Sequence, residues 1–224
     1  ATVAGDLQKA AGYADDALLA IESIYQTRNQ PEEYIAYIET IGKGSIKTAD
    51  EKENMIFNSA EQIFLSENYQ KALVSLQSYK DKYPGGSNLY KADFYMAESY
   101  KSIGKKEQAC DSYRKVISDG EGSFVELSML NLANISYGLE RWEEAFGAYM
   151  SLYNSARLEN NTYVALIGMM RSAFKGHDWT NAVQKAEMFL GDSRADQDLK
   201  LEAKYVKAKS YLASSRRDAA MEIL

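Results

Sequence analysis

An alanine recurs along most of the chain at a nearly constant interval. Its five copies are 37, 36, 37 and 37 residues apart, at Ala72, Ala109, Ala145, Ala182 and Ala219. After each of the first four, apolar side chains follow at steps of three and four residues, which predicts an amphipathic helix. Repeats with periods of roughly 20–50 residues are typical of stacked architectures, so this pattern constrains the fold more than any other feature.

A second apolar stripe precedes each alanine, for example Met169, Met170, Ala173 and Phe174. Short polar breaks, such as Glu140-Arg141, separate the two stripes, and turns of that length make consecutive helices antiparallel. Longer polar links rich in turn residues separate one helix pair from the next. The sequence therefore predicts an all-α protein made of stacked antiparallel helix pairs.

The repeat also predicts the domain organisation, which is one continuous domain. We expect repeats at residues 48–84, 85–120, 121–157 and 158–194, a shortened repeat at 195–224, and a divergent helix pair at 1–47. In that pair, Pro31 suits the first turn of a helix and Gly42 suits a helix end. Thr48 and Glu51 form a capping box for the next helix. The last helix breaks off soon after it begins, so we expect a fragment of a longer chain.

The arrangement resembles the tetratricopeptide repeat. The segment that matches best carries Met96-Ala97, Tyr100, Gly104, Ala109, Tyr113 and Val116, and the segment with Tyr69, Ala72 and Tyr83-Pro84 is similar. The likeness covers roughly residues 48–224. It implies a right-handed superhelical α-solenoid.

The period of 36–37 residues is longer than the usual repeat of about 34. In this it resembles a subgroup of bacterial envelope proteins that includes the Tol–Pal coordinator and the lipoprotein of the β-barrel assembly machine. That narrower resemblance implies a bacterial protein located in the cell envelope or periplasm.

The family resemblance further implies a non-enzymatic scaffold that binds a peptide or partner protein on a concave face lined by first helices. Matching of motif positions places ten candidates there: Phe57, Glu61, Phe64, Phe94, Glu98, Lys101, Asn134, Tyr137, Arg171 and Phe174. Each aromatic taken singly is more often a packing residue than a contact residue. Two alternatives remain, a self-assembly or spacer segment of a larger repeat protein and a catalytic or sugar-binding module.

Charge and hydropathy bear on other partners. The net charge is −6, and the basic residues form no stripe along any segment, which argues against nucleic acid and anionic membrane surfaces. No apolar run approaches the roughly 20 residues that cross a bilayer, so we expect no direct membrane insertion.

Residues suited to chemistry are scarce. His177 is the single histidine and stands in a polar turn, and the single cysteine, Cys110, allows no internal disulfide. The acidic link at 192–202 lacks the spacing of a calcium loop, and we expect it to cap the next helix. The sequence thus predicts no catalytic residue, no cofactor and no metal ion.

Overall fold

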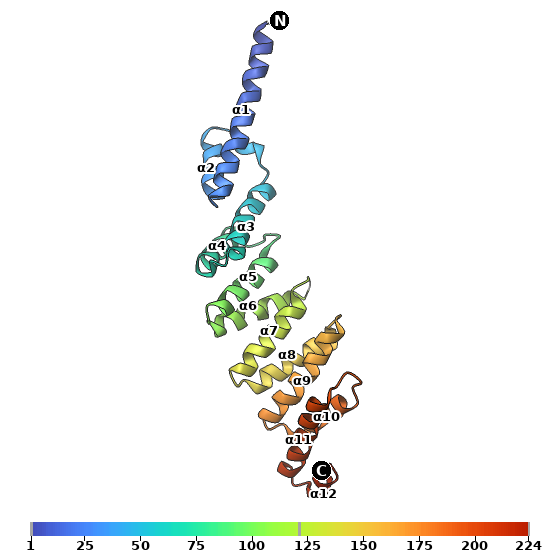
Figure 1. The fold of residues 1–224 in the computed structure, drawn as a ribbon. Coiled ribbons are helices and arrows are strands. Elements are labelled where there is room, and N and C mark those ends of the chain that lie inside the picture. The colour runs from blue at the N-terminus through green and yellow to red at the C-terminus, as the bar shows by residue number, and fades with distance from the viewer. Residues whose placement is uncertain (1, 121, 224) are drawn as a thin grey trace. The chain divides into compact units, whose positions relative to one another are not determined.

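The computed structural model describes residues 2–120 and 122–223 (Figure 1). Residues 1, 121 and 224, which bound three of the predicted segments, lie outside the described residues, as do the side chains of residues 2–8 and 10. The described residues form twelve α-helices and one short 3-10 helix, with no strand among them. The prediction of an all-α fold is confirmed.

The helices belong to two compact units, Ala1–Gly104 and Lys105–Leu224. The first unit holds α1 (Thr2–Thr27), α2 (Pro31–Thr40), η1 (Gly44–Ile46), α3 (Ala49–Leu65), α4 (Tyr69–Lys82) and α5 (Leu89–Ser102). The second holds α6 (Lys106–Asp119), α7 (Val125–Gly138), α8 (Trp142–Ser155), α9 (Glu159–Lys175), α10 (Trp179–Leu190), α11 (Gln197–Ala213) and α12 (Arg217–Met221).

A residue with positive φ stands two positions before α2, α4, α6, α8, α10 and α12. We call it the turn residue, and its copies are Asn29, Glu67, Gly104, Glu140, His177 and Ser215. These are spaced 38, 37, 36, 37 and 38 residues apart. The turn is therefore kept in repeats whose sequence lacks glycine there, at the conformational cost of placing a side chain in the left-handed region.

The turn residue corrects the register of the last repeat. The residue five positions after it is fully buried in α4, α6, α8 and α10, where it is the recurring alanine. In α12 that position falls on Ala220, which is 1% exposed, and the predicted Ala219 is only partly buried. The interval from Ala182 to Ala219 is 37 residues, and the other intervals are 36 or 37 residues. The interval between the turn residues His177 and Ser215 is 38 residues, so the equivalent buried position moves to Ala220. In α2 the equivalent residue is the buried Tyr34.

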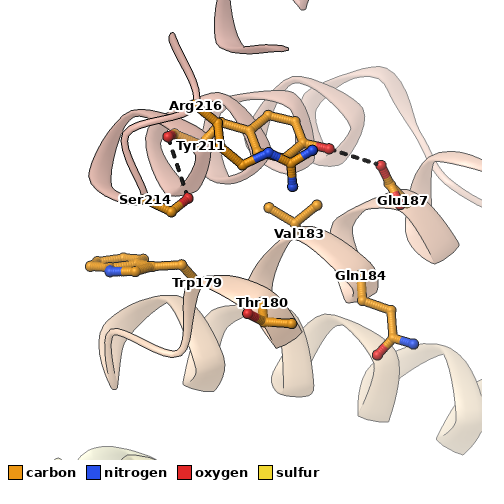
Figure 2. Close-up of a pocket in the computed structure, with 8 residues that line it drawn as sticks. All are labelled: Trp179, Thr180, Val183, Gln184, Glu187, Tyr211, Ser214 and Arg216. Carbon is orange, nitrogen blue, oxygen red and sulfur yellow. Dashed lines mark hydrogen bonds between the residues drawn. The ribbon is translucent and has the colours of Figure 1, made fainter.

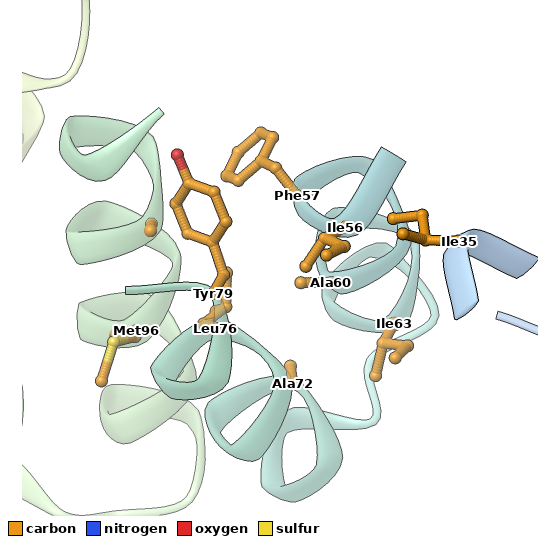
Figure 3. Packing of buried hydrophobic residues seen from close by; sticks show 10 residues of the cluster. Ile35, Ile56, Phe57, Ala60, Ile63, Ala72, Leu76, Tyr79 and Met96 are labelled. Atoms are coloured by element: carbon orange, nitrogen blue, oxygen red, sulfur yellow. The ribbon is translucent and has the colours of Figure 1, made fainter. Parts of the chain in front are cut away.

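The core of the first unit lies among α2, α3, α4 and α5 (Figure 3). Phe57 of α3 packs against Tyr79 of α4, with ring centroids 5.3 Å apart, and against Tyr95 of α5 at 6.3 Å. Ala72 leaves room for the neighbouring helix to approach, so a small residue faces large ones at the centre of the unit. Ile35 of α2 joins the same cluster.

In the second unit, Tyr149 of α8 lies flat against the backbone of Gly168 in α9. A β-carbon on Gly168 would come within 2.5 Å of the Tyr149 ring, so the close approach of the two helices depends on glycine. The neighbouring core residues Met169 and Met170 are also buried. This unit packs its helices around small and flexible side chains.

In two helix pairs, a glutamate near the start of the first helix accepts hydrogen bonds from the link that follows the second helix. Glu53 accepts hydrogen bonds from the Tyr79 hydroxyl and the Ser87 backbone N–H, both at 2.8 Å. Glu126 occupies the equivalent position in α7 and accepts from Arg157 N–H and Asn161 Nδ2, both at 2.8 Å. Both units therefore use a carboxylate as a clamp at the same repeat position.

Hydrogen bonds to these carboxylates change their titration. Burial acting alone would raise the pKa of Glu53, but the hydrogen bonds from Tyr79 and Ser87 outweigh it and hold the pKa below its usual value. The pKa of Glu126 is also lowered, chiefly by the Arg157 N–H and Asn161. Each carboxylate is thus stabilised in its charged form.

The helix starts agree with several sequence predictions. Thr48 and Glu51 make the predicted capping box, with the Glu51 N–H 3.2 Å from the Thr48 hydroxyl. Pro31 begins α2, and Gly42 follows it with φ of 71°. Within the acidic link, Asp196 accepts from the Leu199 N–H at 2.8 Å and caps α11, as expected.

Candidate functional site

The first helices of each unit present a comparable set of positions, which can be counted back from the turn residue. Within the first unit α3 contacts α5, and within the second unit α9 contacts both α7 and α11. Six residues before the turn residue stand Glu61, Glu98, Asn134, Arg171 and Lys209. We call the surface around these positions the first-helix face of each unit.

In the first unit this face is largely engaged in internal contacts. Phe57 and Phe94 are only 1% and 5% exposed, so they pack in the interior. Phe64 stacks on Tyr95 with ring centroids 4.5 Å apart, and the Tyr95 hydroxyl donates to Glu61 at 2.6 Å. These contacts bring α3 and α5 together.

The charged candidates of α5 interact with each other. Glu98 and Lys101 form an ion pair at 2.6 Å on one helix face, and both side chains are partly exposed. A pair at this spacing adds only a few tenths of a kcal/mol, since water screens it.

The aromatic candidates three residues before the turn have a shared structural role. Each meets the first residue of the second helix in its own pair edge to face, as Phe64–Tyr69, Tyr137–Trp142 and Phe174–Trp179, with centroids 5.9, 4.9 and 5.9 Å apart. The sequence predicts a packing role for each aromatic taken singly, and these rings pack beside the turn within their own helix pair. Such contacts contribute about 0.5–1.5 kcal/mol beyond the area that they bury.

In the second unit, a polar network crosses the first-helix face. Arg171 of α9 donates two hydrogen bonds to Glu202 of α11, from Nε and Nη2, both at 2.6 Å. This pairing raises the pKa of Arg171. The exposed Asn134 of α7 accepts from the Tyr149 hydroxyl at 2.6 Å. These two separate contacts fix the orientation of the Arg171 and Asn134 side chains.

Sequence matching missed part of this face in α11. Tyr205 is 55% exposed and Leu212 is 49% exposed, and the Phe174 ring lies 6.1 Å from the Tyr205 ring. The exposed Lys209 lies 5.9 Å from the centroid of the same tyrosine ring. Counting back from Ser215 finds all three, but the sequence gives no glycine to mark that turn.

Residues suited to chemistry do not converge. His177 is exposed in its turn, with its ring 4.9 Å from Trp179, and Cys110 is buried, which raises the pKa of its thiol. Over the described residues, no group of three or more His, Cys, Asp or Glu is placed to hold a metal ion. In the same residues no helix is long and apolar enough to span a membrane.

Sequence comparison identifies the repeat. The family profile described as tetratricopeptide repeat matches residues 91–119. A TPR repeat-containing protein of Methanocaldococcus jannaschii is 32% identical over 91 residues, which are 39% of this chain. Residues 91–119 of the chain therefore match a tetratricopeptide repeat. The aligned part spans only 28% of that relative, which is therefore a much longer protein than the matched segment.

Solved tetratricopeptide repeat structures share the fold. YrrB, described as a TPR protein with an unusual peptide-binding site, matches with a TM-score of 0.55 and 15% identity over 84% of this chain and 88% of its own. MamA of MSR-1 gives a TM-score of 0.51 at 10% identity, over 77% of this chain and 92% of its own. A tetratricopeptide repeat protein from Parabacteroides merdae covers 93% of this chain and 76% of its own, with a TM-score of 0.50 at 10% identity. The envelope subgroup stays a prediction.

Proposed function

We propose that the chain is a non-enzymatic scaffold that binds a peptide or partner protein on the first-helix face of its second unit. One observation carries the proposal: the partly exposed Arg171 of α9 is held by two hydrogen bonds to Glu202 of α11, and the same helix α9 presents the partly exposed ring of Phe174. Aromatic and arginine side chains supply much of the energy of protein interfaces. An aromatic ring next to a fixed arginine offers both apolar area and directional hydrogen bonds.

The fold neighbours are consistent with this role, because YrrB, a protein of the same repeat class, is described as having a peptide-binding site. The first unit is less suited to the task, since Phe57 and Phe94 are buried. We therefore place the main contact area on α9 and α11 and reassign the candidate set to Arg171, Phe174, Tyr205, Lys209 and Leu212.

An affinity capture with the whole chain as bait tests the proposal. The test variant is Tyr205→Ala with Lys209→Glu, both at exposed positions. The matched control is Val74→Ala with Lys71→Glu, at exposed positions of α4. Arg171→Glu is avoided because it would place two carboxylates against each other at Glu202. Loss of a retained protein in the test variant alone supports the proposal, and equal retention by both variants contradicts it.

A second candidate function is self-association through α1. This helix exposes Tyr13, Leu19 and Ile24 at separate points along its length, and pairing with a second copy would bury them. Sedimentation of the chain and of Leu19→Glu separates the possibilities. A dimer that dissociates in the variant supports self-association, and a monomer at every concentration removes it.

A further inference from the structure

Two clefts recur at the same register in the second unit. The first has a volume of about 280 Å³ and is lined by Trp142, Glu143, Phe146, Ser172, Ala173, Gly176 and Asp178. The second has about 230 Å³ and is lined by Trp179, Thr180, Val183, Gln184, Glu187, Tyr211, Ser214 and Arg216. In each, a tryptophan begins the second helix of one pair, and the far wall comes from the turn of the next pair.

The second cleft holds a cation that belongs to the chain itself (Figure 2). The guanidinium carbon of Arg216 lies 4.5 Å from the centroid of the Tyr211 ring. The Tyr211 hydroxyl donates to Glu187 at 3.4 Å, so a carboxylate stands at the same cleft. Aromatic faces and a carboxylate are the surroundings that favour a guanidinium or ammonium group.

The first cleft also has aromatic walls, but an acid replaces that arginine, and Ala173 stands at the position of Tyr211. The residue directly after the turn residue is Arg216 in the second cleft and Asp178 in the first. Aromatic rings come from Trp142 and Phe146, and Trp142 is held edge to face by Tyr137 at 4.9 Å.

Two carboxylates, Glu143 and Asp178, lie at this first cleft. The hydrogen bonds that Asp178 accepts come from uncharged groups. Asp178 accepts from the Asn181 backbone N–H at 3.0 Å and from Asn181 Nδ2 at 2.6 Å, which leaves its charge uncompensated by that residue. Glu143 is exposed in the first turn of α8. The first cleft thus combines aromatic faces with negative charge.

We propose that the cleft between Trp142 and Asp178 binds the side chain of an arginine or lysine presented by a partner protein. The volume is below the roughly 300–1,000 Å³ of small-molecule pockets and suits a single long side chain. Charge complementarity selects a cation, and the neighbouring cleft has a guanidinium of the chain's own among its lining residues. The inference does not depend on the first-helix face, because other residues carry it.

Nuclear magnetic resonance tests the proposal directly, since the chain has two tryptophans and each lines one cleft. The whole labelled chain is titrated with Nα-acetyl-arginine methylamide while both indole N–H signals are followed. We expect the Trp142 signal to shift with a saturable, millimolar response. The Trp179 signal is expected to stay unchanged because the positive charge of Arg216 in the wall of its cleft repels a second cation.

Matched ligands and variants decide the outcome. Nα-acetyl-citrulline methylamide, which has nearly the same shape without the charge, is expected to give no saturable shift. Glu143→Gln with Asp178→Asn keeps a helix-capping side chain and is expected to weaken arginine binding at least about threefold. Arg216→Ala removes that positive charge from the wall of the second cleft and is expected to make Trp179 respond as well. An absent Trp142 response, an equal response to citrulline, or unchanged affinity in the double variant would overturn the proposal.

Discussion

The first-helix faces of the two units have different character at equivalent repeat positions. Six residues before the turn, the first unit carries Glu61 and Glu98, whereas the second carries Asn134, Arg171 and Lys209. The side chains ten residues before the turn differ as well. Phe57 is buried under α4 and α5, whereas its counterpart Tyr205 in α11 is more than half exposed, since the positions equivalent to Tyr79 and Tyr95 fall after residue 224.

This difference separates the positions that build a repeat from those that distinguish one repeat from another. The buried alanine and the left-handed turn residue recur in both units, because close helix packing and a short connection need them. Positions on the first helices contact either solvent or a neighbouring helix. Their side chains therefore differ in charge and size from one repeat to the next. The variable positions are accordingly where a partner is to be sought.

Replacing the equivalent aromatic residues Phe57 and Tyr205 by alanine is expected to give the largest difference between the two units. Phe57→Ala is expected to lower the free energy of unfolding of the first unit by about 3–5 kcal/mol, because a buried ring leaves a cavity. Tyr205→Ala is expected to change stability by about 0.5 kcal/mol or less, because more than half of its surface is already exposed. Denaturant titration with hydrogen exchange resolved by helix measures both, and similar losses would refute the contrast.

The carboxylate clamps of Glu53 and Glu126 are a feature that both units share, and their effect on stability depends on pH. The pKa values of Glu53 and Glu126 are lowered in the folded chain, so their contribution is present above the unfolded value near 4.5 and is lost as pH falls through the folded value. We expect both units to lose stability below about pH 4.5. Glu53→Gln and Glu126→Gln should each cost about 1 kcal/mol at neutral pH and flatten the acid response of their own unit.

Thermal melts at a series of pH values provide this measurement. Glu67→Gln is the matched control, since this exposed turn residue is not part of a clamp. An acid response that persists fully in both clamp variants would show that other groups control it.

The ion pairs give a smaller contrast. Arg171 holds Glu202 of another helix through two hydrogen bonds, whereas Lys101 pairs with Glu98 three residues earlier on its own helix. We expect Arg171→Gln to lower stability by about 1 kcal/mol and Lys101→Gln by about 0.3 kcal/mol, since both pairs are partly exposed and screened. Denaturation at low and high salt measures both, and equal costs would count against a special role for the inter-helix pair.

The turn residues should give the smallest effect and the same one in each unit. Glu67 and Glu140 have φ of 62° and 60°, a region that glycine adopts without a side-chain penalty. Glu67→Gly and Glu140→Gly are each expected to raise the free energy of unfolding by about 0.5 kcal/mol, because relief of strain slightly exceeds the added chain entropy. A loss of stability in either variant, seen in a thermal melt, would show that the side chain makes a needed contact.

Much of the fold was predictable because its signals are local. The alanine interval, the stripes at three- and four-residue steps and the capping box of Thr48 and Glu51 depend on residues within a few turns of one another. Less of the candidate site followed. Phe57 and Phe64 share a stripe in the sequence, yet one is buried and the other lies partly exposed on Tyr95.

By itself, the sequence determined that this protein consists of repeated helix pairs and which residue types recur in them. The tertiary structure decided the register of the last pair at Ala220, the burial of Phe57 and the placement of Arg216 against the Tyr211 ring. Helix periodicity arises from neighbours along the chain, whereas exposure and cleft shape arise from side chains about 30 residues away that only packing brings together.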